Sequence, residues 1–403
     1  MKKRIIAVLL CFVLAFSGCS AEKKQEEEKE EPVQSTQNET EEKKDEEDRA
    51  YQAKLDVIWP SAYNNADGLT LEKGSYISVI GKSEKGAFWE EVKKGAEQAA
   101  EDINTKLGYE GKDKVKVTYN GPSESENVDE QVNILDEELA RYPVAVAISI
   151  VDTQACKVQF DIATENGIPV VAFDSGSDYK GLMAMVSTDN SKAAKEAADK
   201  MAESLGEGEV IVIAHDSKSE TASVREKIFI KRMKNKHPQI KISGDYRLDE
   251  MKKTVSEEVN AGKYCLDDSQ PSGQPLAEEE KVAVEAISNE DVLNYILKKH
   301  PDVDGIYITN DTSTNETVKA LERAGIEGVN VIGYDADGEE IQALKDGKIK
   351  GLMVQNPFGM GYASVIAAAR AALKLGNEAY IDTGYIWVTK DNLEGNDVQK
   401  MLY

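Results

Sequence analysis

From residue 75 onward, short apolar runs rich in β-branched residues alternate with longer amphipathic stretches. The apolar runs, which predict strands, are Tyr76–Ile80, Val115–Tyr119, Val144–Ile150, Ile168–Phe173, Val210–Ala214, Ile240–Ile242, Gly305–Thr309, Val329–Tyr334 and Ile349–Val354. Between most of them lie stretches with helical spacing, namely Phe88–Leu107, Asp129–Tyr142, Lys192–Leu205, Ser223–Lys236, Asp291–His300, Thr314–Ala324 and Gly361–Leu375. This rhythm predicts parallel sheets whose strands are joined by helical crossovers.

The number of predicted strands is too large for one sheet, and the runs are almost continuously apolar, as in sheets covered on both faces. We therefore predict an α/β fold of two doubly wound parallel-sheet lobes joined by a multi-strand hinge. The predicted organisation is an N-terminal extension at 51–74, a first lobe at 75–188 plus 356–384, and a second lobe at 189–355 plus 385–403. The polar stretch 251–287 interrupts the rhythm of the second lobe, and we interpret it as an insertion that forms a mobile surface loop.

The first residues of the chain have the pattern of an export signal. Three basic residues precede a short apolar run from Ile5 to Phe16, which is too short to span a bilayer as a mature helix. The run ends in Ser17-Gly18-Cys19, which resembles the lipobox of bacterial lipoproteins. This resemblance implies a signal peptide at 1–18 and lipidation of Cys19, which would hold the protein on the outer face of a Gram-positive cell membrane. The alternative is an ordinary signal peptide with an incidental cysteine.

The charge of the chain narrows the range of partners. Residues 20–48 hold 13 acidic residues and 5 lysines without an aromatic residue, so we interpret 19–50 as a disordered acidic tether. The whole chain has a formal net charge of −25, which argues against nucleic acid or an anionic lipid surface as a partner. Hydrophobic residues make up 40 % of the chain, which suffices for cores but not for a multi-span membrane protein.

Polar side chains gather where the predicted strands end, which is where open α/β sheets form their ligand crevice. Lys82 and Ser83 follow the first strand, and Phe88 and Trp89 open the next helix. The other strand ends carry short carboxylates and amides, namely Asp174, Asn310 with Asp311, Asp335, and Gln355 with Asn356. Such side chains bridge neighbouring hydroxyl groups, and an aromatic ring stacks on the C–H face of a sugar, so the set suits a neutral polyhydroxyl ligand. A single Asp at such a position is equally well explained as a helix N-cap.

Catalytic, metal and nucleotide sites are not supported by the residues. No nucleophile–base pair occurs at the strand ends, and the three histidines are isolated, so we predict neither an enzyme nor a metal site. No glycine-rich phosphate loop follows a strand, so we predict no cofactor. Cys156 and Cys265 remain after removal of the signal peptide and lipidation of Cys19. We expect them to remain thiols, because a bridge between two moving lobes would hinder closure.

From about Ser75 to the end, the chain resembles the ribose/galactose type of periplasmic sugar-binding proteins, the substrate receptors of ABC importers. The stretches that carry the resemblance are Gly86–Trp89, Ile168–Asp174, Thr188–Asn190, His300–Gly305, Asn310-Asp311, Val331–Asp335 and Gln355–Pro357. The resemblance implies that the ligand-binding residues are Phe88, Trp89, Asp174, Arg225, Asn310, Asp335 and Gln355. Gly86, Ser175 and Ile228 depart from the family pattern, so ribose itself is not implied. Tyr246 is a candidate for the second-lobe aromatic residue.

The resemblance also implies a function and partners. We expect a monomeric, extracytoplasmic, lipid-anchored receptor that closes around a monosaccharide or similar polyol and delivers it to an ABC permease. A sensory receptor that presents bound sugar to a membrane kinase is the first alternative, because its cleft chemistry would be the same. A surface hydrolase on the same type of fold is the second, and it lacks the catalytic residues it would need. Sugar-responsive repressors share the fold, but they have a DNA-binding headpiece and no signal peptide.

Overall fold

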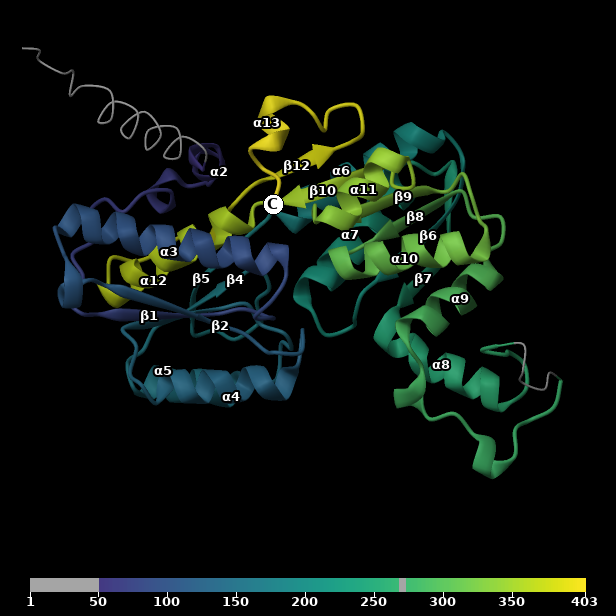
Figure 1. Ribbon diagram of the computed structural model, residues 1–403, viewed down its shortest axis with the longest axis horizontal. Coiled ribbons are helices and arrows are strands. Elements are labelled where there is room, and N and C mark those ends of the chain that lie inside the picture. Colours follow the sequence, from purple (N-terminus) through teal and green to yellow (C-terminus); the bar gives the residue numbers. More distant parts are fainter. Residues whose placement is uncertain (1–50, 268–272) are drawn as a thin grey trace, which may run out of the picture. The chain divides into compact units, whose positions relative to one another are not determined.

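The computed structural model describes residues 51–267 and 273–403. The predicted signal peptide, Cys19 and the acidic tether lie outside the described residues. The described chain contains two six-stranded sheets, and apart from one edge pair their strands run parallel. This confirms the predicted α/β fold with two parallel-sheet lobes (Figure 1).

The first sheet has the strand order β11-β5-β4-β3-β1-β2. Its strands are β1 (Tyr76–Ile80), β2 (Lys116–Asn120), β3 (Ala145–Ile148), β4 (Val170–Phe173), β5 (Leu182–Ser187) and β11 (Tyr380–Asp382). Helices α3 (Ala87–Leu107) and α12 (Pro357–Ala372) cover one face, and α4 (Val128–Leu139) and α5 (Lys157–Glu165) cover the other (Figure 1). The strand order reverses beside β1, so the ends of β1 and β3 form the crevice of this sheet.

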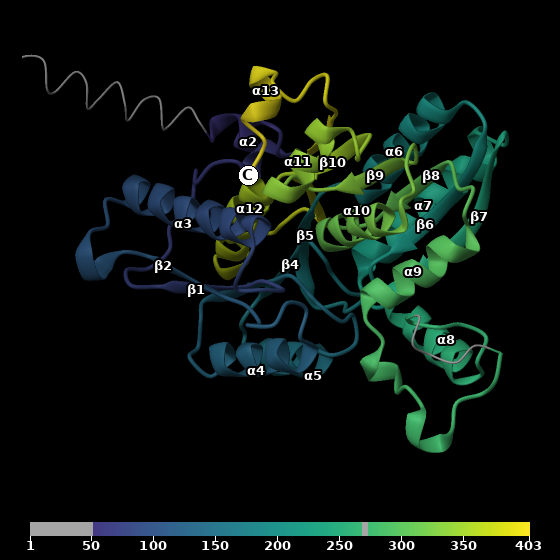
Figure 2. The ribbon, with the colours of Figure 1, turned by 45° about the vertical axis from the view of Figure 1, so that its right-hand side comes forward.

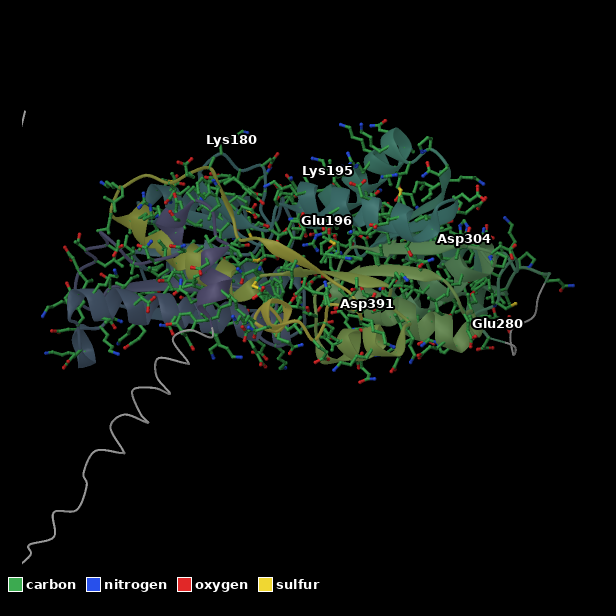
Figure 3. The ribbon with its side chains drawn as sticks, turned by 90° about the horizontal axis from the view of Figure 1, so that it is seen from above. Lys180, Lys195, Glu196, Glu280, Asp304 and Asp391 are labelled. Carbon is green, nitrogen blue, oxygen red and sulfur yellow. The ribbon has the colours of Figure 1, made fainter. Side chains whose placement is uncertain are left out.

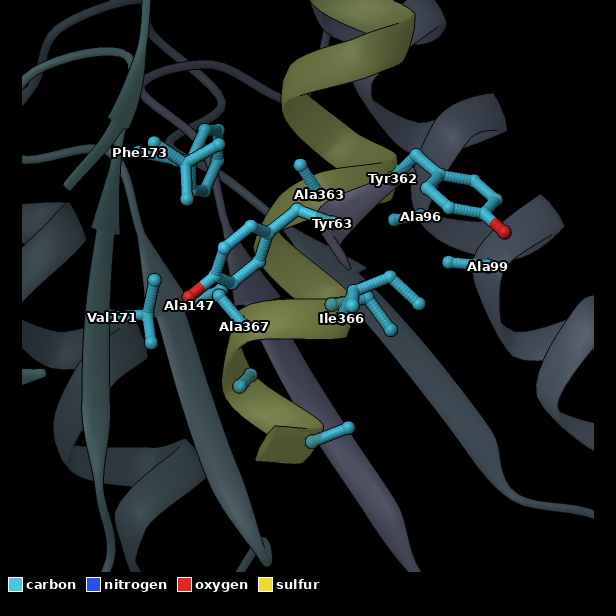
Figure 4. Close-up of a cluster of buried hydrophobic side chains, with 14 of the residues drawn as sticks. Tyr63, Ala96, Ala99, Ala147, Val171, Phe173, Tyr362, Ala363, Ile366 and Ala367 are labelled. Carbon is cyan, nitrogen blue, oxygen red and sulfur yellow. The ribbon is translucent and has the colours of Figure 1, made fainter. Parts of the chain in front are cut away.

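Helix α12 forms the centre of the first-lobe core. It is apolar around its whole circumference and lies between α3 and the sheet, where Ala363 and Ile366 contact the buried cluster (Figure 4). Two glycines let the helices approach closely. A Cβ atom on Gly95 would lie 2.0 Å from the carbonyl oxygen of Phe358, and one on Gly361 would lie 1.9 Å from that of Val92. Only residues without a side chain therefore fit at this crossing.

The second sheet repeats the same arrangement, in the order β12-β10-β9-β8-β6-β7. Its strands are β6 (Gly208–Ala214), β7 (Ile240–Arg247), β8 (Gly305–Ile308), β9 (Asn330–Tyr334), β10 (Gly351–Gln355) and β12 (Tyr385–Val388). Its helices are α6 (Asn190–Leu205), α7 (Glu220–Lys236), α8 (Leu248–Asn260), α9 (Asn289–Lys299), α10 (Asp311–Ala324) and α11 (Gly338–Asp346). A short helix, α13 (Asn396–Gln399), follows β12 near the end of the chain.

The chain passes between the two sheets after β5, after β10 and after β11. These crossings are tied to one another by hydrogen bonds. The Thr188 hydroxyl donates to the Gly384 carbonyl (3.3 Å), and the Asn356 amide donates to the Thr383 carbonyl (2.9 Å). Since the third crossing leads directly from β11 to β12, β12 pairs with β10 in the antiparallel sense. The three connections therefore form one laterally bonded hinge.

The prediction of a mobile loop at 251–287 is wrong for residues 251–260, which are helical. Residues up to Asn260 continue helix α8, because Leu248, Val255 and Val259 form a buried stripe with helical spacing among Lys, Glu and Ser. The described part of the following segment extends away from the sheet in Figures 1 and 2. It is fixed to α8, since the Asn260 side chain exchanges hydrogen bonds with the Val282 backbone at 3.0 and 2.8 Å.

The N-terminal extension is folded against the first lobe. It contains α2 (Gln52–Asp56) and a 3₁₀ turn at Ser61–Tyr63, and its apolar residues join the core around α12. Its backbone also reaches the hinge, because Trp59 exchanges two hydrogen bonds with Asp382 (2.8 and 2.9 Å). The extension is therefore part of the folded body and contacts a hinge crossing.

The surface of the described residues is charged, and labelled residues such as Lys180, Glu280 and Asp391 are exposed (Figure 3). No helix in the described ranges combines the length and apolar character needed to cross a membrane. No disulfide joins Cys156 to Cys265, and Cys156 is buried beside α5.

Candidate functional site

A cavity of about 560 Å³ lies between the carboxyl ends of the two sheets, a size typical of small-molecule sites. The structure brings all seven sequence-predicted residues together at this cavity. They are Phe88, Trp89 and Asp174 from the first lobe, and Arg225, Asn310, Asp335 and Gln355 from the second. Their role in binding remains a prediction. Asp174, Asn310, Asp335 and Gln355 meet there because they lie at strand ends, whereas Phe88, Trp89 and Arg225 come from helices α3 and α7.

The two aromatic residues occupy different environments at the start of α3. Phe88 is only 9 % exposed and belongs to the first-lobe core, whereas Trp89 is half-buried at its edge. Their rings meet edge to face, with centroids 4.9 Å apart and planes at 73°. Adjacent helical residues point about 100° apart, which explains the difference. Both rings border the cavity, so both remain candidates for stacking on a ligand.

Asp174 has a cationic partner that the sequence reasoning did not assign. Its Oδ2 accepts a hydrogen bond from the Ser149 hydroxyl (2.8 Å) and lies 3.6 Å from Lys82 Nζ. Lys82 and Asp174 are both buried, so each offsets part of the other's desolvation. Lys82 lies two residues after the end of β1, and this position at a strand end was the sequence signal that could place it at the cavity. Its pairing with a residue 92 positions away had no local signature.

Arg225 is the most heavily bonded side chain at the cavity. Its Nε donates to Asn190 Oδ1 (2.7 Å), its Nη1 to the Thr309 carbonyl (2.6 Å) and its Nη2 to Gln355 Oε1 (2.7 Å). The guanidinium also lies over the ring of Tyr334, 3.9 Å from its centroid. Three of its five N–H groups are therefore held by protein acceptors, which fixes the fork while leaving two donors for other partners.

Gln355 connects Arg225 to Asp335. Its Oε1 accepts from Arg225, and its Nε2 donates to Asp335 Oδ1 (3.0 Å) and Oδ2 (3.2 Å). Asp335 follows β9 with a φ of +75°, a conformation that Asp and Asn adopt more readily than most residues. Burial raises the pKa of Asp335 to about 7, with Asp311 adding to the rise and Arg225 opposing it. Burial therefore favours the protonated form of this carboxyl group relative to an exposed aspartate.

Asn310 has a structural role in addition to its place at the cavity. Its side-chain oxygen accepts from the Ser313 amide (3.0 Å) and caps α10. Asn310 is therefore the N-cap of α10. Its amide NH₂ group is not needed for the cap, so capping and ligand contact are compatible.

Further titratable groups line the cavity besides the seven predicted ligand-binding residues. Glu126 lies in the loop after β2, Asp311 is the first residue of α10, and His215 follows β6. Burial raises the pKa of Glu126, with Lys82 opposing the rise and Asp216 adding to it. Burial also lowers the pKa of His215, and its Nδ1 lies 2.8 Å from the Thr309 hydroxyl. His215 and Asp311 stand at strand ends, whereas nothing local to Glu126 indicated its place.

Glu126, His215 and Asp216 are the described residues that could hold a metal ion. Their potential ligand atoms lie within 4.8 Å of one another. The cations of Lys82 and Arg225 act on the same imidazole and lower its pKa, so a further cation would be repelled there. The donor set is thus a weak candidate, and the absence of a metal site stays a prediction.

The structure does not bring Tyr246 to the cavity. This candidate for a second-lobe aromatic lies on β7, where its hydroxyl is 2.6 Å from His300 Nε2. The ring contacts the core on the side of the sheet covered by α8 and α9. An aromatic residue that does contact a cavity-lining carboxylate is Tyr403, whose hydroxyl donates to Asp335 Oδ1 (2.7 Å).

The chain is similar in sequence and fold to known solute-binding proteins. The ribose import binding protein RbsB of Escherichia coli is 24 % identical over 292 residues, which cover 72 % of this chain and 83 % of the relative. The xylitol-binding protein of Mycolicibacterium smegmatis is 24 % identical over 292 residues, which cover 71 % of this chain and 72 % of the relative. A carbohydrate transporter solute binding protein from Agrobacterium radiobacter, solved with D-arabinose, is 25 % identical with a TM-score of 0.64, covering 82 % and 99 % of the two chains. These relatives are transport proteins and not enzymes.

Residues 77–378 match the family described as periplasmic binding protein domain, and this range runs from β1 to just before β11. The match therefore includes every described strand except the edge strands β11 and β12, the first two hinge crossings and all seven predicted residues at the cavity. The chain belongs to the periplasmic binding protein family.

Proposed function

We propose that this protein is a receptor that binds a monosaccharide or a similar polyol in the cavity between its lobes and delivers it to an ABC importer. The observation that carries the proposal is the composition of the cavity. An aromatic pair from the first lobe meets carboxylate, amide and guanidinium groups from both lobes around about 560 Å³. Relatives of similar length are named for ribose and xylitol, which supports this ligand class.

The mechanism follows from the division of the site between two bodies. The lobes at 75–188 with 356–384 and at 189–355 with 385–403 each supply part of the lining. A sugar in an open cleft contacts one part, and only the closed form adds the other, so ligand favours closure by its differential affinity. The permease then recognises the closed form of a monomeric receptor. Names of relatives as import proteins favour transport over presentation to a kinase.

A ligand panel tests this proposal. We expect at least one pentose, hexose or polyol to raise the melting temperature of the protein, because a ligand that binds only the folded state stabilises it. Calorimetry on that compound should give one site per chain, and short oligosaccharides should have a weaker effect because of the cavity volume. The proposal is wrong if no compound of these classes shifts the melting temperature at millimolar concentration.

The location of the receptor is the second part of the proposal. We infer that the lipobox-like sequence directs lipidation of Cys19 and that the acidic segment up to residue 50 links the anchor to the folded body. The folded body then lies outside the cytoplasmic membrane of a Gram-positive cell, where no outer membrane retains an unanchored receptor.

Replacement of Cys19 tests the anchor. We expect Cys19→Ser to move the protein from the membrane fraction to the medium, because acyl chains would be the only strong membrane contact. Fractionation and immunoblotting measure this, and Cys11→Ser in the apolar run serves as the matched control that remains on the membrane. A Cys19→Ser protein that stays entirely in the membrane pellet would instead indicate an uncleaved signal anchor.

A further inference from the structure

Tyr403 connects the two halves of the candidate site. Its ring packs edge to face on Phe88 of the first lobe, with centroids 6.1 Å apart and planes at 76°. Its hydroxyl donates to Asp335 of the second lobe at 2.7 Å. The same side chain packs against the cores of both lobes. It is therefore in direct contact with two residues proposed to bind the sugar, although it comes from a segment far from either in sequence.

Lys54 of the N-terminal extension holds the backbone next to Tyr403. Its Nζ donates to the carbonyl oxygen of Leu402 (3.3 Å) and pairs with Glu91 of α3 at 2.7 Å. The carbonyl oxygen of Lys54 in turn accepts from the side chain of Asn356 at a hinge crossing (2.6 Å). The Lys54 and Glu91 side chains are only 11 % and 12 % exposed. The position of Tyr403 is thus determined by buried contacts to the extension, to α3 and to the hinge.

The contacts of Asp335 indicate what the hydroxyl of Tyr403 does. Oδ1 accepts two hydrogen bonds, from Tyr403 (2.7 Å) and from Gln355 (3.0 Å). Oδ2 accepts only the longer bond from Gln355 (3.2 Å). Two donors on one oxygen fix the plane of the carboxylate and leave Oδ2 with more acceptor capacity for a further donor.

We propose that Tyr403 is a positioning residue for the ligand: its hydroxyl orients the Asp335 carboxylate, and its ring packs against Phe88. This inference rests on the proposed binding of a sugar by Asp335. It assigns a role in affinity to the C-terminal segment and, through Lys54, to the N-terminal extension.

A hydroxyl that donates to the ionised carboxylate also changes the titration of Asp335. Asp311, which faces Asp335, raises the pKa of this carboxyl, whereas Arg225 and the donors Tyr403 and Gln355 lower it. Glu340 is a further buried acid in electrostatic contact with Asp335. Removal of the Tyr403 hydroxyl therefore moves the pKa of Asp335 upward, while the other four groups remain.

The variant Tyr403→Phe tests the inference, with Tyr109→Phe as matched control because its hydroxyl bonds the Leu71 carbonyl away from the cavity. The probes are the pentoses, hexoses and polyols of the ligand panel, with D-ribose, D-arabinose, D-galactose and xylitol among them, and the one that raises the melting temperature of the wild type most is used. We expect Tyr403→Phe to bind it about tenfold more weakly at pH 7.5. We also expect the pH midpoint of binding to move upward, whereas Tyr109→Phe should match the wild type in both.

Melting without sugar provides an independent readout. Loss of a donor to the ionised carboxylate should lower the melting temperature of Tyr403→Phe more at pH 8 than at pH 5, relative to the wild type. Unchanged affinity and an unchanged pH midpoint in Tyr403→Phe would overturn the inference while leaving sugar binding intact. If Tyr403→Phe binds more weakly but keeps the wild-type pH midpoint, the hydroxyl does not act through the Asp335 carboxylate. The loss of affinity then comes from altered packing alone, and this result also overturns the inference. A wild type that binds none of the probes overturns the proposed function, and the role in affinity with it.

Discussion

Asp335→Asn is expected to lose sugar affinity and to gain stability. Asn has the same shape and tolerates the φ of +75° at this position, so the backbone should not change. Loss of the charged acceptor should weaken binding by roughly 1.5–3 kcal/mol, the range for hydrogen bonds to charged groups. Isothermal calorimetry with the cognate sugar measures this part of the prediction.

The gain in stability follows from the raised pKa of Asp335. Its pKa rises from 3.8 to about 7 on folding, so the unfolded chain releases this proton first. The group therefore destabilises the folded protein progressively as pH rises from about 4 to about 7, by about 4 kcal/mol in full. Without sugar, Asp335→Asn should consequently melt at a higher temperature than wild type at pH 8, with the difference disappearing toward pH 4.

An exposed acid supplies the control for this experiment. Asp391→Asn removes a charge from the surface and should change neither affinity nor the pH dependence of melting (Figure 3). If Asp335→Asn melts below the wild type at pH 8, the ionised carboxylate is a net stabilising group through its contacts to Gln355 and Tyr403. The prediction that Asp335 supports sugar binding at a cost in stability would then be wrong.

Arg225→Met is expected to have the largest effect on the folded protein itself. The side chain is buried, and its removal leaves acceptors on Asn190, Thr309 and Gln355 without their donor. Unsatisfied buried acceptors are costly, so we expect the free energy of unfolding to fall by about 3–5 kcal/mol. Sugar binding should become undetectable, because Gln355 and through it Asp335 lose their fixed orientation. Denaturant unfolding and calorimetry measure the two effects.

Arg232 on the same helix provides a matched control for Arg225. It pairs with Asp199 at 2.7 Å, and both side chains are about one-third exposed. Exposed ion pairs contribute little, so Arg232→Met should cost less than about 1 kcal/mol and leave sugar affinity unchanged. Wild-type affinity in Arg225→Met would remove Arg225 from the proposed site, and wild-type stability would show that its bonds are replaced by water.

The alternation of apolar runs and amphipathic stretches was sufficient to predict the two lobes. Strong periodic segments such as Ala87–Leu107 were located to within a residue. Weaker segments were missed, including β5 at Leu182–Ser187, where Ala184 and two methionines replace the usual β-branched residues. Helix α8 was hidden because its apolar stripe is sparse among charged residues. In both cases tertiary packing supplied what local preference did not.

The candidate site shows the same limit. Strand-end positions predicted Asp174, Asn310, Asp335 and Gln355, because parallel strands deliver their exits to one edge of a sheet. The partners of these residues were not predictable, since the contact of Lys82 with Asp174 and that of Tyr403 with Asp335 depend on how distant segments pack. Sequence position thus indicates which side chains reach the cavity, whereas the network that orients them comes from the folded structure.

The glycine crossing between α3 and α12 makes the aromatic side of the cavity depend on a distant fit. Gly95 lies seven residues after Phe88, about 10 Å along the same helix. A methyl group there would act as a wedge that tilts α3 and shifts both rings at its N-terminal end, without touching any ligand. The width of the cavity therefore depends partly on the close contact between the backbones of α3 and α12. Residues that do not touch the ligand thus contribute to how well the ligand fits.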